Sequence, residues 1–181
     1  MIKQVATLLL ATIMLQACSQ NSNKNSSNFR ETFTLLYKSA GNFFTEVKGP
    51  PIISNMFGTP DTIGYRLKVL PDGVTDWKNI SGSNSEKQTI FFKLGAYSTD
   101  STAMAKRFNE VIAIIRQIDP AATINYDDSY SDSKIKEVYI CPGSGPCGED
   151  DHWRVSLYLH RFNGNEFNVS VNIQAFPPGA D

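Results

Sequence analysis

The stretch WRVSLYLHRFNGNEFNVSVNIQA, residues 153–175, decides the fold because apolar and polar side chains alternate in two runs on either side of a turn. Alternation with a period of two is typical of a strand that buries one face. A three-residue loop at 163–165 places Leu159 opposite Val169 and keeps the apolar side chains on one face. A two-residue loop mixes the faces unless a bulge corrects the register. The stretch therefore predicts an antiparallel hairpin with one apolar and one polar face.

The polar face of this hairpin is a candidate binding surface. It combines a cation, aromatic rings and uncharged hydrogen-bonding groups, which suits a protein or glycan partner; a plain solvent-facing surface is the alternative. The alternation pairs Arg154, Ser156, Tyr158 and His160 with Gln174, Asn172, Ser170 and Asn168, in that order. The candidate binding residues are Arg154, Tyr158, His160, Asn168 and Asn172.

Two helical stripes precede the strands. Apolar residues at spacings of three and four predict helices at 29–48 and 102–118. Asn28 is the expected N-cap of the first helix, and Asp100 or Ser101 that of the second. The stripes consist of Phe29, Phe33, Leu36, Ala40, Phe43 and Val47 in the first helix, and Met104, Phe108, Val111, Ile115 and Ile118 in the second.

The remaining segments predict further strands. Gly49-Pro50-Pro51 is expected to stop the first helix, and residues 50–62 are expected to form a loop. Strands are predicted at 63–69, 74–80, 88–97, 122–126 and 134–140. The order of elements indicates an α+β fold, with an antiparallel sheet of about six to seven strands and two helices packed on one face. It also suggests two degenerate helix-and-three-strand units.

The first twenty residues, MIKQVATLLLATIMLQACSQ, predict export. Lys3 precedes an uncharged apolar run at 5–15 that is too short to span a bilayer. Leu15-Gln16-Ala17-Cys18 resembles the lipobox of bacterial lipoproteins. The resemblance implies that residues 1–17 are removed and that Cys18 carries the lipid. An ordinary secretory peptide, cleaved elsewhere, is the alternative.

The resemblance also implies an address and a domain organisation. Ser19, where an Asp would retain a lipoprotein at the inner membrane, favours the outer membrane of a bacterial envelope. Residues 19–28 are polar and small and contain no apolar side chain, so we expect residues 18–28 to form a lipidated cysteine and a flexible tether. Residues 29–181 are expected to form a single α+β domain.

The other two cysteines, Cys141 and Cys147, form an even pair in an oxidising compartment and predict a disulfide bond. A zinc site is the alternative, with His152 and Asp150 or Asp151 as further ligands. The spacing of these residues is irregular, so no metal is expected. The acidic residues at 149–151, with Asp127, Asp128 and Asp132, are interpreted as solvated turns rather than a calcium site.

Composition and motifs limit the function. A net charge of −1 gives no indication of nucleic-acid binding. The histidines are His152 and His160, and no Gly-x-Ser-x-Gly elbow or phosphate-binding motif is present, so we expect neither catalysis nor a cofactor. The sequence predicts a lipid-anchored envelope protein that acts as a non-enzymatic binding module, either an envelope component or an inhibitor or immunity-type partner. The alternative is a small-ligand carrier or hydrolase with a pocket between sheet and helices.

Overall fold

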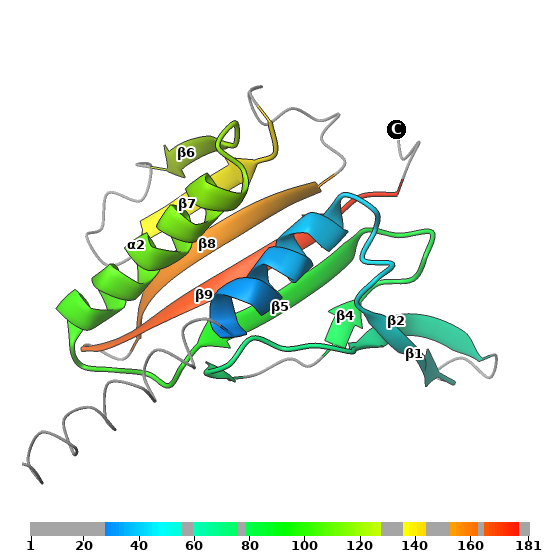
Figure 1. The fold of residues 1–181 in the computed structure, drawn as a ribbon. Coiled ribbons are helices and arrows are strands. Elements are labelled where there is room, and N and C mark those ends of the chain that lie inside the picture. Colours follow the sequence, from blue (N-terminus) through cyan, green and yellow to red (C-terminus); the bar gives the residue numbers. More distant parts are fainter. Residues whose placement is uncertain are drawn as a thin grey trace, which may run out of the picture.

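The computed structural model describes residues 28–55, 60–75, 79–127, 136–143, 153–162 and 165–177. These residues form two layers, an antiparallel sheet of nine strands and a pair of helices on one of its faces (Figure 1). The predicted α+β class is therefore confirmed. The sheet is larger than the six to seven strands predicted, because the first half of the chain contributes more strands than its alternation indicates.

The elements follow one another as helix, five strands, helix and four strands. The N-terminal helix covers residues 28–40. It is followed by β1 (Lys48–Ser54), β2 (Asp61–Leu67), β3 (Val74–Thr75), β4 (Asn79–Ser81) and β5 (Gln88–Leu94). Then come α2 (Ser101–Ile118), β6 (Thr123–Asp127), β7 (Lys136–Cys141), β8 (Trp153–Phe162) and β9 (Glu166–Ala175). The strand order is β1-β2-β4-β5-β9-β8-β7-β6, with β3 also paired to β5, so the two helix-and-strand halves meet at β5 and β9.

The predicted helix at 29–48 is too long. The helix ends at residue 40, and Phe43 and Phe44 have φ angles of 60° and 59°, in the left-handed region that an α-helix cannot pass through. The predicted stripe continues past this point through Phe43 and Val47, but Phe43 is only partly buried, whereas Phe44 and Val47 are fully buried in the core. At these residues the apolar spacing therefore reflects burial of the side chains and does not indicate a helical backbone.

The predicted loop at 50–62 is also wrong in its first part, because β1 occupies Lys48–Ser54. This strand lies at the edge of the sheet and pairs only with β2. An edge strand tolerates proline because one side of its backbone needs no ladder partner, so Pro50 and Pro51 fit here. The predicted strand at 74–80 is divided into β3 and β4, both of which pair with β5.

One glycine fixes the approach of β2 to β4. Gly64 is buried, and a Cβ at this position would collide with the backbone oxygen of Ile80. The two strands can therefore pair closely only because this position has no side chain.

The register of the β8–β9 hairpin is the one predicted. Leu159 lies opposite Val169, and Phe162 pairs with Glu166, which leaves residues 163–165 as the connection. The alternating aliphatic side chains at 155, 157 and 159 of β8 and at 169, 171 and 173 of β9 are buried, and Figure 1 shows both helices on the same side of the sheet. The core consequently lies between that side and the helices.

The helices attach to the sheet through aromatic and aliphatic contacts. The ring of Phe33 meets that of Phe92 on β5 edge to face, with centroids 6.4 Å apart. Helix α2 buries Phe108 and Ile115 among other residues, and Asp100, one of the two predicted candidates, is its N-cap. The Asp100 Oδ1 atom accepts a hydrogen bond of 2.9 Å from the Ala103 amide.

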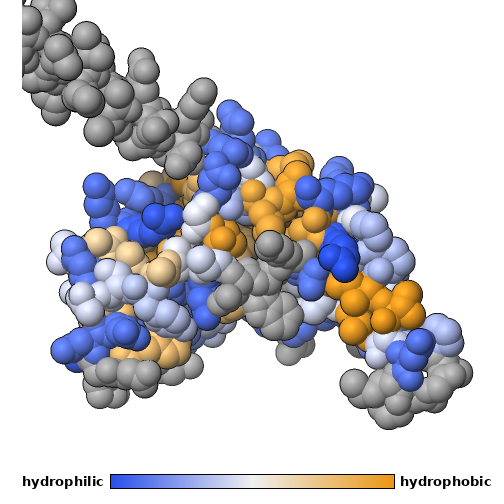
Figure 2. Space-filling view, turned by 90° about the horizontal axis from the view of Figure 1, so that it is seen from below, coloured by the Kyte–Doolittle hydropathy of each residue, from blue (hydrophilic) through white to orange (hydrophobic). Residues whose placement is uncertain are grey.

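The surface mixes polar and apolar regions. Seen from below, apolar side chains reach the surface in separate patches with hydrophilic side chains between them (Figure 2). Exposed large apolar side chains include Leu35, Ile53, Ile63, Tyr97, Tyr126 and Phe162. Within the described residues, neither helix has the length and apolarity needed to cross a membrane.

Candidate functional site

The candidate site lies on the side of the sheet that faces away from the helices, which we call the outer face. Alternation along β8 and β9 sends their polar side chains to this face. The structure pairs Arg154 with Gln174, Ser156 with Asn172, Tyr158 with Ser170 and His160 with Asn168, so the predicted polar ladder is confirmed. Neighbouring strands extend it, because Glu137 of β7 lies opposite Tyr158, and Lys93 of β5 lies opposite Ser170.

Four of the five candidate binding residues line one cavity of about 340 Å³ on the outer face. These four are Tyr158, His160, Asn168 and Asn172. The cavity is also lined by Phe91, Lys93, Phe162 and Ser170. Its volume lies at the lower end of the range of about 300–1,000 Å³ typical of ligand pockets.

Arg154, the fifth candidate, lies on the same face but does not line the cavity. Its Nε atom donates a hydrogen bond of 2.8 Å to Gln174 Oε1. The guanidinium carbon also lies 5.4 Å from the ring centroid of Phe176. These contacts give Arg154 a fixed position outside the cavity.

An aromatic row of Tyr158, His160, Phe162 and Tyr97 runs along one side of the cavity. The Tyr158 and His160 rings are stacked with centroids 5.2 Å apart, and the His160 and Phe162 centroids are 5.6 Å apart. Phe162 meets Tyr97 edge to face at 5.1 Å. The row ends in solvent, since Tyr97 is 43% and Phe162 39% exposed.

Two side-chain oxygens in the cavity wall have no hydrogen-bond partner among the described residues. Asn168 is 1% exposed, and its Nδ2 atom donates a hydrogen bond of 3.1 Å to the Gly95 carbonyl. Its Oδ1 atom, like the Oδ1 atom of Asn172, is buried without a donor. Leaving a buried acceptor unpaired costs about 1–3 kcal/mol, so a ligand that brings N–H or O–H groups would relieve this cost.

Two charged residues lie next to the aromatic row: Lys93, which lines the cavity, and Glu137, which lies opposite Tyr158. Burial lowers the pKa of His160 below its usual value, and the positive charge of Lys93 lowers it further, while Glu137 opposes both. Burial also raises the pKa of Tyr158. At neutral pH the aromatic row therefore carries a neutral imidazole and a protonated phenol, next to the buried Glu137. His160 Nε2 and Ser170 Oγ share a hydrogen bond of 3.1 Å.

Sequence reasoning missed the contribution of β5. Phe91 and Lys93 alternate with the buried Ile90 and Phe92, so their direction is readable from the sequence. Their place beside Asn172 and Ser170 depends on β5 pairing with β9, and no local pattern encodes which strands become neighbours.

Other predicted sites are described in part. Cys141 is fully buried at the end of β7, whereas Cys147, His152 and the acidic residues 149–151 lie outside the described residues. Asp127 ends β6, and Asp128 and Asp132 lie outside as well. The disulfide between Cys141 and Cys147 thus stays a prediction, as do the leader and Cys18. In the part of the chain that the structure describes, no group of three His, Cys, Asp or Glu residues lies together as a metal site.

Searches against protein-family models, curated proteins and solved structures find no match to this chain.

Proposed function

We propose that this chain is a lipid-anchored protein of the bacterial envelope that binds a protein partner through the outer face of its sheet, without catalysing a reaction. The anchor is the lipid on Cys18. The contact surface is centred on the cavity formed by Tyr158, His160, Asn168 and Asn172.

The observation that carries the binding role is the pair of unpaired amide oxygens beside an exposed aromatic pair. Asn168 Oδ1 and Asn172 Oδ1 accept no hydrogen bond from the part of the chain that the structure describes, and backbone N–H groups of a partner would supply the missing donors. Tyr97 and Phe162 offer rigid aromatic contact area next to them. Aromatic residues of this kind dominate the binding energy of protein interfaces.

The anchor is tested by growing cells with a clickable palmitate analogue and comparing the natural chain with Cys18→Ser. We expect label on the natural chain, none on the variant, and release of the variant from the membrane fraction. An unlabelled natural chain would overturn the anchor and leave the contact surface to its own test.

The contact surface is tested by capture of a partner from envelope extracts, using the full chain with Tyr97→Ala and Phe162→Ala together. Each hot-spot aromatic contributes on the order of 2 kcal/mol, so we expect capture to fall by at least about tenfold. Leu35→Ala is the matched control, because Leu35 is similarly exposed, at 40%, on the N-terminal helix at the other side of the sheet. Equal capture by both variants, or capture of glycan in place of protein, would overturn this assignment.

A further inference from the structure

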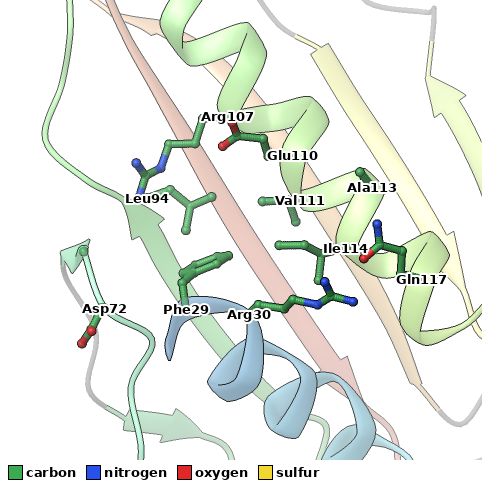
Figure 3. A pocket seen from close by; sticks show the side chains of 11 residues that line it. Phe29, Arg30, Asp72, Leu94, Arg107, Glu110, Val111, Ala113, Ile114 and Gln117 are labelled. Carbon is green, nitrogen blue, oxygen red and sulfur yellow. The ribbon is translucent and has the colours of Figure 1, made fainter. Parts of the chain in front are cut away.

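A second and larger cavity, of about 610 Å³, lies between the N-terminal helix and α2 (Figure 3). It is separate from the site described above, because the helices occupy the opposite side of the sheet from the outer face. Residues of both helices and of β5 line it. Its volume lies within the range of about 300–1,000 Å³ typical of small-molecule sites.

The floor of this cavity is apolar. Phe29 comes from the N-terminal helix, Leu94 from β5, and Val111 and Ile114 from α2. Leu94 and Val111 are each 1% exposed, while Phe29 and Ile114 are partly exposed. The Phe29 ring stacks on Phe33 with centroids 5.8 Å apart, so the floor is held by the core.

Two cations flank the floor. Figure 3 shows Arg30 and Arg107 reaching from the two helices on either side of the apolar side chains. Neither guanidinium forms an ion pair or hydrogen bond with another described residue. An unpaired guanidinium beside an apolar surface favours a ligand with an anionic group.

Two acids also line the cavity, and they differ in their contacts. Asp72 Oδ2 accepts a hydrogen bond of 2.9 Å from Asn28 Nδ2, which engages this carboxylate at the rim. Glu110 is exposed on α2, three residues after Arg107. The acids therefore limit how much negative charge the site accepts, and a single anionic headgroup fits this balance better than a polyanion.

We propose that the cavity between the helices binds a single-chain amphiphile with an anionic headgroup, such as a fatty acid. The hydrocarbon chain lies over Phe29, Leu94, Val111 and Ile114, and the headgroup lies at one end of this floor, against Arg30 or Arg107. The anchor proposed above would keep this cavity near a source of such ligands. The ten residues from Cys18 to the start of the described chain would span roughly 16–19 Å as a flexible tether.

The first test measures chain length. The mature chain, residues 18–181 with Cys18→Ser, retains every described residue and carries no acyl group that could compete for the cavity. Octanoate, decanoate and laurate are titrated below their micelle concentrations by isothermal titration calorimetry. Each buried CH₂ contributes about 0.8 kcal/mol, so affinity should rise by up to about fourfold per methylene until the cavity is full.

The second test fills the cavity. Ala113 lines it and is exposed on α2, so Ala113→Trp adds a large ring without removing a core contact. We expect this variant to bind laurate at least about tenfold more weakly, a loss of 1.4 kcal/mol. Ala103→Trp is the matched control, since Ala103 is exposed on the same helix and does not line the cavity; its affinity should stay within about twofold.

The third test changes the charge of the cavity and of the ligand headgroup. Arg30→Gln and Arg107→Gln together should weaken laurate binding, whereas Glu110→Gln should preserve or strengthen it. Dodecyltrimethylammonium, which has a cationic headgroup, should bind the unmodified site more weakly than laurate. Any one of three results would overturn the proposal: an affinity independent of chain length, equal laurate binding by Ala113→Trp and Ala103→Trp, or a preference for the cationic amphiphile. None of these measurements depends on the anchor or on the outer face.

Discussion

The Tyr37 hydroxyl donates a hydrogen bond of 3.0 Å to Oδ2 of Asp119, which joins the N-terminal helix to the residue that caps the end of α2. Tyr37 is 2% exposed, and its ring packs edge to face on Trp153 with centroids 4.6 Å apart. Burial and the neighbouring carboxylate both raise the pKa of Tyr37, so it stays a donor throughout the working pH range. One side chain thus fixes both helices against β8.

Removing this hydroxyl should destabilise the fold without changing its shape. Tyr37→Phe loses a hydrogen bond to a charged acceptor, and we expect the free energy of unfolding to fall by about 1–2 kcal/mol. Urea unfolding measures this loss. The control is Tyr126→Phe, because Tyr126 is 57% exposed, and its effect should stay below about 0.5 kcal/mol. Equal stability of the two variants would show that the helix-to-helix contact contributes nothing.

The start of α2 should depend on the Asp100 carboxylate, which accepts the Ala103 amide. Replacing an N-cap aspartate by alanine costs about 1 kcal/mol, whereas asparagine caps nearly as well, so Asp100→Ala should lower the urea midpoint and Asp100→Asn should not. If both substitutions were neutral, the cap would not stabilise this helix in solution.

Stability should also decrease in mild acid because of His160. Burial places its folded-state pKa below the usual value of 6.5, so the unfolded chain takes up a proton first as the pH falls. The free energy of unfolding therefore decreases as the pH falls below 6.5 toward the folded-state pKa. Between pH 7.5 and 5, His160→Gln should lose less stability than the unmodified chain. Parallel profiles for the two proteins would contradict a buried neutral imidazole.

The predicted disulfide is tested by counting thiols in the mature chain with Cys18→Ser. Under denaturing conditions we expect no reactive thiol before reduction. After reduction we expect two reactive thiols, those of Cys141 and Cys147. A bridge across so short a loop contributes on the order of 2–3 kcal/mol if unstrained, so reduction should also lower the melting temperature. Two reactive thiols before reduction would remove the bridge and favour the zinc alternative.

The β8–β9 hairpin was predictable because its pattern is both local and redundant. Three successive apolar pairs, at 155 with 173, 157 with 171 and 159 with 169, agree on one register, and a one-residue slip would move this apolar set to the other face. The same parity assigned Tyr158, His160, Asn168 and Asn172 to one polar face. These four residues now line a single cavity.

The segment from residue 41 to Ser54 was not predictable by the same reasoning. Phe44 and Val47 lie in a turn and are buried, so apolar residues continue at helical spacing where no helix is present. The prolines of β1 are typical of a loop, although here they lie in an edge strand. In both places long-range packing overrides the local signal. Phe91 and Lys93 were missed for a related reason, since the pairing of β5 with β9 joins segments about eighty residues apart.

Photo-crosslinking in intact cells tests the role of the outer face most directly. A benzophenone amino acid replaces Phe162, which ends the aromatic row and is 39% exposed, or Leu35, which is 40% exposed on the helical side. We expect position 162 to crosslink to one envelope protein and position 35 to give no such product. The same product from both positions, or a product from position 35 alone, would contradict a binding surface on the outer face of the sheet.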